Sequence, residues 1–143
     1  MKPALDKLLD WYENLAPQNV SRVGEFYAAN ASFRDPFNDV VGTPAIQRIF
    51  EHMFESTNAP RFIIRERLLQ GEQAFVTWVF EFQLLGKPYT VEGASHITFS
   101  PDGFVCAHRD YWDAAEELFQ KLPVIGGLFR LLRRRFSASR GTR

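Results

Sequence analysis

The chain has a single cysteine, Cys106, among its 143 residues, so no disulfide bond can form within it. No segment approaches the roughly 20 apolar residues that a membrane-spanning helix needs. Met1–Asn14 carries charges throughout and has no apolar run, which argues against a signal peptide and predicts a cytoplasmic location. Metal-ligand spacings, glycine-rich phosphate loops and serine elbows are also missing, so we expect neither a metal nor a cofactor.

The net charge is zero, but the basic residues are concentrated near one end. Residues 121–143 hold seven basic residues and no acidic one, which leaves 10 basic and 17 acidic residues before them. We therefore expect a domain of residues 1–122 and a basic amphipathic tail of residues 123–143. The tail could lie on an anionic membrane surface, or dock on the domain or on a partner subunit. The acidic body argues against a nucleic-acid partner.

Apolar residues at spacings of three and four predict helices in the first part of the chain. We expect them at Ala4–Leu15, at Val20–Ala29, and from Thr43, as the N-cap before Pro44, to about Ser56. Two further short helices are expected within residues 113–122 and 128–136.

From Arg61 the apolar period changes to two, which predicts strands. The expected strands are Arg61–Leu69, Phe75–Leu85, Tyr89–Phe99 and Phe104–Trp112. Three helices followed by a four-stranded antiparallel meander give an α+β domain whose twisted sheet wraps the third helix. With 14 phenylalanines and three tryptophans, the interior should be lined by rings.

The last predicted strand carries the most unusual combination of side chains. Alternate residues of a strand share a face, so His108, Asp110 and Trp112 point the same way. An unpaired charge is costly in a packed core, so these residues are a candidate site if the face lines a cavity. Asp110 could instead form a structural ion pair with Arg34 or Arg109.

Three short motifs occur in order between about Leu5 and Asp113. They are Phe33-Arg34-Asp35-Pro36-Phe37, Gly42-Thr43-Pro44-Ala45-Ile46, and Arg109-Asp110-Tyr111-Trp112-Asp113. Together they resemble the nuclear-transport-factor-2-like superfamily, in its SnoaL-like and ketosteroid-isomerase-like branch. The resemblance implies a cone-shaped NTF2-like fold, in which helices pack on a strongly curved antiparallel sheet around a cavity, usually in a homodimer.

The resemblance also implies roles for individual residues. Asp35 matches the general base of the ketosteroid isomerases, while Trp11 and Ser95 match the positions of their two hydrogen-bond donors. Asp110 matches the aspartate that activates water in limonene-epoxide hydrolase, and His108 with Asp110 could imitate the His and Asp of SnoaL-type cyclases. Asp35 could equally cap the turn before Pro36.

On the resemblance we expect eight residues to line the cavity, although a cavity wall and a core look alike in sequence. They are Trp11, Phe37, Phe50, Phe54, Trp78, Phe80, Ser95 and Trp112. We expect Cys106 to be a small buried residue, His52 to face solvent, and His96 to lie on a dimer surface with Glu92 and Thr98.

Three functions fit these observations. The first is a cofactor-independent acid–base enzyme of the isomerase, cyclase or hydrolase type, acting through Asp35, His108 and Asp110 on a small or medium apolar molecule, with a lipid-like one among the candidates. The second is a carrier or sensor that binds a lipophilic acid in the same cavity. The third is a dimeric scaffold with a filled interior.

Overall fold

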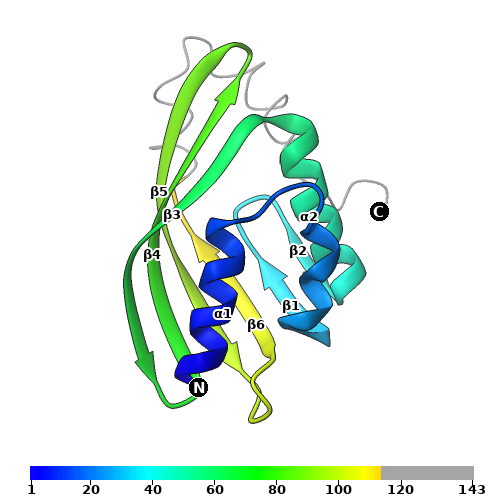
Figure 1. Ribbon diagram of the computed structural model, residues 1–143, viewed down its shortest axis with the longest axis vertical. Helices are drawn as coiled ribbons and strands as arrows, with labels where there is room; N and C mark the ends of the chain where they lie inside the picture. Colours follow the sequence, from blue (N-terminus) through cyan, green and yellow to red (C-terminus); the bar gives the residue numbers. More distant parts are fainter. Residues whose placement is uncertain (114–143) are drawn as a thin grey trace.

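The computed structural model describes residues 1–113, which form one bent sheet with helices packed inside its curve (Figure 1). The helical elements are α1 (Lys2–Glu13), the 3₁₀ helix η1 (Val20–Glu25) and α2 (Thr43–Ser56). The strands are β1 (Tyr27–Arg34), β2 (Asp39–Val41), β3 (Asn58–Gln70), β4 (Gln73–Leu84), β5 (Lys87–Phe99) and β6 (Val105–Tyr111). This confirms the predicted α+β class.

The six strands are ordered β2-β1-β6-β5-β4-β3, and only the pair β1–β6 is parallel. The predicted antiparallel meander corresponds to β3 to β6, and β1 and β2 extend the sheet beyond β6. The register sets Phe33 of β1 beside His108, and Ser95 of β5 beside Asp110. The last strand therefore lies inside the sheet, where its side chains meet residues from both halves of the chain.

The prediction of a helix over Val20–Ala29 was wrong in its second half. Only the 3₁₀ turn Val20–Glu25 is helical, and the chain is extended from Tyr27 onward. The reason is tertiary, because Tyr27 pairs with Val105 and the backbone amide of Val105 bonds to the carbonyl of Phe26 at 2.8 Å. A short apolar run gives no periodicity that separates these alternatives.

Helix α2 begins and ends where the sequence predicts, but its N-cap is Gly42. Gly42 has a φ of +100°, a left-handed conformation that favours glycine over other residues. Pro44 lies in the first turn, where its missing N–H has no cost.

The main core lies between α1, α2 and the inner face of the sheet. Helix α1 buries one stripe, and α2 buries Ile46 and Phe50 beside it. The buried residues of α1 are Leu5, Leu8, Leu9, Trp11 and Tyr12. A second cluster, around Trp78, Phe80 and Phe82 of β4, extends along the sheet away from this core. The candidate site lies between these two apolar groups.

The outer face of the sheet carries His96, whose ring stacks on Phe75 with the centroids 4.3 Å apart. Phe75 and Tyr111 are both about half exposed on this face. A homodimer through this face stays a prediction. The basic tail lies outside the described residues, as do the two helices expected after residue 113. No helix within residues 1–113 combines the length and the apolar character that crossing a bilayer requires.

Candidate functional site

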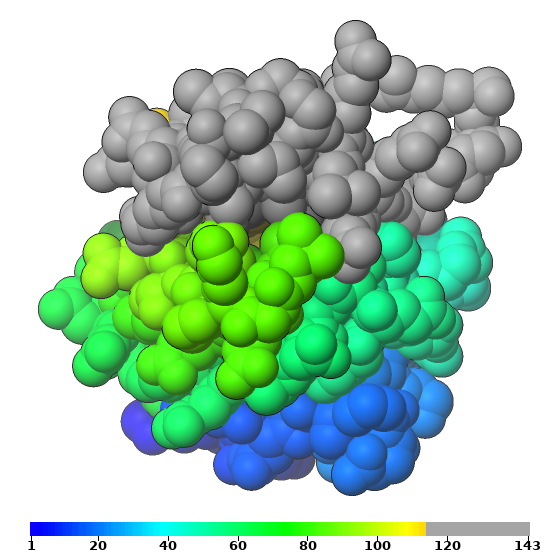
Figure 2. Space-filling model, turned by 90° about the horizontal axis from the view of Figure 1, so that it is seen from above, coloured from blue at the N-terminus to red at the C-terminus, as the bar shows by residue number. Residues whose placement is uncertain are grey.

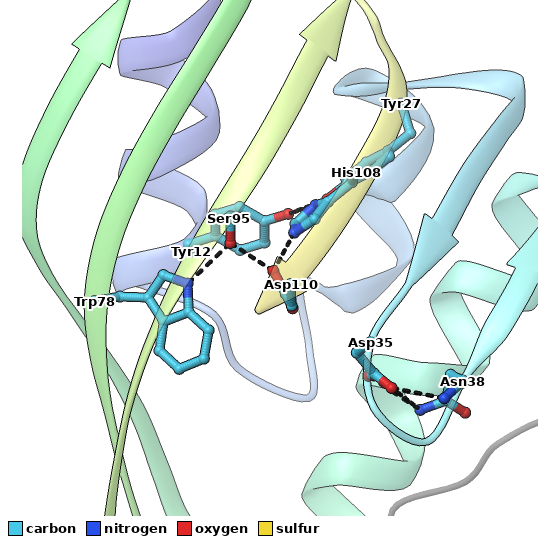
Figure 3. A network of polar contacts seen from close by, with 8 residues as sticks. All are labelled: Tyr12, Tyr27, Asp35, Asn38, Trp78, Ser95, His108 and Asp110. Atoms are coloured by element: carbon cyan, nitrogen blue, oxygen red, sulfur yellow. Dashed lines mark hydrogen bonds and ion pairs between the residues drawn. The ribbon is translucent and has the colours of Figure 1, made fainter. Parts of the chain in front are cut away.

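A chain of hydrogen bonds converges on the carboxylate of Asp110 (Figure 3). The Nε2 atom of His108 lies 2.6 Å from Asp110 Oδ1, and the hydroxyl of Ser95 donates to the same oxygen at 2.5 Å. The indole N–H of Trp78 donates to Ser95 Oγ at 2.8 Å. Within residues 1–113, both hydrogen bonds to this carboxylate end on Oδ1. Oδ2 accepts neither of these two hydrogen bonds.

Two tyrosines complete the chain behind His108. The hydroxyls of Tyr27 and Tyr12 lie 2.7 Å and 2.9 Å from His108 Nδ1, and they also hydrogen-bond to each other. With Asp110 ionised and His108 neutral, one arrangement of protons leads from Tyr12 to the carboxylate. Tyr12 donates to Tyr27, Tyr27 donates to Nδ1, and Nε2–H donates to Asp110. The donors then all point toward one negative charge.

Burial keeps both tyrosines protonated. It raises the pKa of Tyr12 and of Tyr27 well above the ordinary range, because a phenolate would lose its hydration there. The nearby charge of Asp110 raises both pKa values further. The two hydroxyls therefore act as fixed donors at neutral pH, and they hold the imidazole in place.

The histidine itself is enclosed. His108 is only 4% exposed, and its ring lies against that of Phe33 with the centroids 4.6 Å apart. No side-chain polar atom buried within residues 1–113 lacks a hydrogen-bond partner. A buried polar network with all of its members satisfied is rigid, so it can fix the position of a reacting group.

A cavity of about 80 Å³ opens in front of Asp110. It is lined by Phe33, Asp35, Phe37, Asn38, Ile49, Phe50, His52, Met53, Phe62, Trp78, Phe80, Phe82, Val91, Asp110 and Trp112. A deeper space of about 30 Å³ continues toward Tyr12, Ser95 and His108, and Asp110 borders both. The carboxylate therefore lies at the junction of an aromatic pocket and the buried network.

Asp35 reaches the same pocket from the loop after β1, apart from the network around Asp110 (Figure 3). Its Oδ1 accepts the backbone N–H groups of Phe37 at 2.8 Å and Asn38 at 2.6 Å, and the Asn38 amide donates to both carboxylate oxygens. Asp35 thus anchors the turn and also lines the cavity. Burial raises its pKa to about 6, and the negative charge of Asp110 contributes to that rise.

Replacement of Asp35 by asparagine should change how stability depends on pH. The folded protein holds this proton more tightly than the unfolded chain does, so the contribution of Asp35 is largest below about pH 4 and falls until about pH 6. Relative to the native protein, Asp35→Asn should therefore gain about 1–3 kcal/mol between pH 4.5 and pH 7.5. Urea unfolding at both pH values measures this gain. Asp39→Asn, at an exposed carboxylate of β2, is the control and should show none. An equal difference at both pH values would contradict the assignment.

The structure brings several of the predicted site residues to these two cavities. Asp35 and Asp110 line the cavity of about 80 Å³, which is the larger of the two and is called the large pocket below. His108 and Ser95 border the deeper space. Five of the expected lining rings also reach the large pocket: Phe37, Phe50, Trp78, Phe80 and Trp112. Within residues 1–113, the ion-pair partner of Asp110 is His108 and neither Arg34 nor Arg109. Arg109 points to the opposite face, where its guanidinium lies over the ring of Tyr111.

Two expected lining residues lie elsewhere. Trp11 packs in the core, where it stacks on Phe26 and donates its indole N–H to the carbonyl of Asn19. Phe54 borders a separate groove beside Glu13 and Arg61. One wall of this groove comes from residues 12–15 and the other from residues 53–62, around the start of β3. In Figure 2 the N-terminal segment (blue) and the region around the start of β3 (green) lie next to each other. Trp11 and Tyr12 are both buried residues of α1, but of the two only Tyr12 borders the deeper space. The prediction for Trp11 was therefore wrong by one position along the helix.

Two further expectations need correction. His52 is half-buried and lines the large pocket, because α2 turns this side chain toward the sheet. Cys106 is half-buried, and its thiol lies 3.3 Å from the carbonyl of Thr98, which it meets where the β5–β6 register shifts. That irregularity places Val105 in the core position that strict alternation assigns to Cys106.

Three residues of the site were not among those predicted from the sequence. Tyr12 lies on the apolar stripe that predicts α1, so its position was available from the sequence. Tyr27 was hidden by the incorrect helix. Phe62 borders both cavities, but nothing in the sequence distinguishes it from other rings of the strands. Within residues 1–113, no group of three or more His, Cys, Asp or Glu is placed to hold a metal ion.

A bent sheet around two helices, enclosing an aromatic pocket with buried carboxylates, defines an NTF2-like domain. The family model for the SnoaL-like domain matches residues 8–108, most of the chain. The protein belongs to the SnoaL-like family.

Solved structures support the same fold. A protein with a ketosteroid-isomerase-like fold from Catenulispora acidiphila DSM 44928, in complex with trimethylamine, is 17% identical, with a TM-score of 0.71 over 81% of this chain and 92% of the other. TerC, co-crystallised with polyporic acid, is 19% identical, with a TM-score of 0.71 over 84% and 97%. A protein proposed to be a SnoaL-like polyketide cyclase, from Jannaschia sp. CCS1, is 14% identical, with a TM-score of 0.68 over 79% and 87%. No curated protein matches the chain.

Proposed function

We propose that the protein is an acid–base enzyme that needs no cofactor and acts on a small, largely apolar molecule, as an isomerase, cyclase or hydrolase does. One observation carries this proposal: the Asp110 carboxylate has one oxygen fixed by His108 and Ser95, while the residue lines an aromatic pocket that also contains Asp35. A positioned base beside a poorly hydrated cavity is what proton abstraction requires.

In this proposal Asp110 is the base and acts through Oδ2. His108 and Ser95 are positioning residues, because they bind the other oxygen and prevent the carboxylate from turning. Asp35 carries the proton to or from the substrate, since its pKa of about 6 lets it exist in both forms near neutral pH. The tyrosines hold His108 from behind.

The solved relatives show that this fold accommodates small molecules, namely trimethylamine in one and polyporic acid in another. Their low sequence identity carries no residue role to this chain.

A non-catalytic carrier is the second candidate function. It is favoured by the complete hydrogen bonding of Asp35, whose two oxygens are both bound within its own turn. A carboxylate used in this way can line a binding pocket without taking part in proton transfer.

The elimination of 5-nitrobenzisoxazole tests for a base in the pocket. A base removes the proton at carbon 3, the ring N–O bond breaks, and the coloured nitrophenolate that forms is followed by absorbance. We expect the native protein to accelerate this reaction and Asp110→Asn to lower kcat/KM by about 100-fold or more. The control Asp39→Asn should react like the native protein.

The same assay separates the two carboxylates. With Asp110 as the base, Asp35→Asn should keep most of the activity. Loss of activity in Asp35→Asn, with a native rate in Asp110→Asn, would transfer the role of base to Asp35. No acceleration by the native protein over the rate in buffer would favour the carrier.

A further inference from the structure

The large pocket has an uneven charge. Asp35 and Asp110 both line it; among residues 1–113, His52 is the only other ionisable side chain of the lining, and this part of the chain contributes neither lysine nor arginine to it. Arg109, the basic neighbour of Asp110 in sequence, is exposed and lies over Tyr111. With both carboxylates ionised, the walls of the pocket present negative charge to anything that enters.

Aromatic rings face the same space at several angles. The lining includes Phe33, Phe37, Phe50, Phe62, Trp78, Phe80, Phe82 and Trp112. The ring of Phe62 is perpendicular to that of Trp78, at 87° and 5.9 Å, and is stacked on Phe80 at 21° and 4.6 Å. Near Asp35, Phe37 and Trp112 meet at 60° with their centroids 5.6 Å apart. Ring faces carry negative potential, so differently oriented rings around one space attract a positive group.

We propose that the pocket binds a small organic cation, in which an alkylated ammonium group lies among the rings and near Asp35 and Asp110. This rests on the proposed function only in placing the working site at this pocket, and it does not depend on catalysis. The observations that carry it are the ring lining and the two carboxylates, to which residues 1–113 add no lysine or arginine.

A bound cation would offset the negative charge of the two carboxylates. The charge of Asp110 already disfavours the ionised form of Asp35, so the two anions repel each other across the pocket. A cation between them removes this repulsion and replaces lost hydration, whereas an anionic ligand would add a third negative charge. A volume of about 80 Å³ suits a compact group rather than a lipid chain. The structure therefore argues against the lipophilic acid of the carrier hypothesis.

Three ligands of nearly equal shape test this proposal. Choline, 3,3-dimethyl-1-butanol and 3,3-dimethylbutanoate carry a positive, a neutral and a negative charge, respectively. Titration calorimetry should show choline binding at least about tenfold more tightly than the neutral alcohol, and the carboxylate binding most weakly. Equal affinity for choline and the alcohol, or preference for the carboxylate, would overturn the proposal.

Substitutions assign the effect to the pocket. Asp110→Asn should weaken choline binding about tenfold or more and leave binding of the alcohol nearly unchanged, while Asp39→Asn should change neither. Phe80→Leu should also reduce the preference for choline over the alcohol. An unchanged preference in both pocket variants would place the cation elsewhere and overturn the assignment.

The proposal also predicts the direction in which the affinity for choline changes with pH. Choline keeps its charge at all pH values, so only protein groups titrate, and those that line the pocket are Asp35, Asp110 and His52. Asp35, whose pKa is about 6, ionises between pH 5 and pH 7 and thereby favours a cation, so choline binding should strengthen from pH 5 to pH 7. Binding that weakens over this range would count against the proposal. Tight binding of choline without any elimination activity would refute the proposed catalysis alone.

Discussion

Replacement of His108 by phenylalanine is expected to lower the free energy of unfolding by about 3–5 kcal/mol at pH 7. The ring fits beside Phe33, so the loss comes from polar groups and not from a cavity. Asp110 loses the donor at 2.6 Å, and Tyr27 loses the acceptor of its hydroxyl at 2.7 Å. Buried polar groups that are left without partners are costly. Urea denaturation measures the effect.

A matched control and a rescue make this prediction specific. His96→Phe, on the outer face where the ring stacks on Phe75, should change stability by no more than about 0.5 kcal/mol. The double variant His108→Phe/Asp110→Leu should recover part of the loss, because it removes the charge together with its partner. If His108→Phe costs no more than the control, the network does not stabilise the fold.

Replacement of Gly93 by alanine is expected to lower the free energy of unfolding by about 3 kcal/mol. Gly93 of β5 lies directly opposite Trp78 of β4, and an added Cβ would come closer than 3.0 Å to three carbons of the indole ring. The indole cannot move freely, since it is buried and bonds to Ser95 at 2.8 Å. Displacing it would also release Ser95 from its position on Asp110.

The control for this substitution is Gly24→Ala in η1. A Cβ there would meet nothing within 4 Å, and the residue has no positive φ, so stability should change by no more than about 0.5 kcal/mol. Urea unfolding of the two variants gives the comparison. Equal stability of both would mean that the indole shifts without resistance, and that Trp78 does not fix the network.

Much of the fold was predictable because its elements carry strong periodic patterns. The limits of α2 and the inward phase of β6 follow from spacing alone, and they place Asp110 and His108 on the face that forms the site. The limits of β1 do not, because that strand forms by pairing with a segment more than 70 residues later. Local propensity cannot report such a partner.

The same distinction applies to the candidate site. The motif around Asp35 indicates a carboxylate before Pro36, but only coordinates show that its oxygens also bind Asn38. Likewise, the sequence does not reveal that two tyrosines meet at one imidazole nitrogen, because each comes from a different element. Residue type and phase predict which face a side chain occupies, whereas hydrogen-bond partners depend on packing between distant segments.

The central place of β6 also bears on how the nascent protein acquires its structure. Tyr12 and Tyr27 contact His108 at sequence separations of 96 and 81 residues, so these contacts raise the contact order and favour slow folding. Without β6 the sheet would divide into a β1–β2 pair and a β3–β4–β5 group, and each part would gain an unpaired edge. Exposed strand edges can pair with other chains, which promotes aggregation during synthesis. The strand that carries Asp110 is thus also the one that joins the two halves of the sheet.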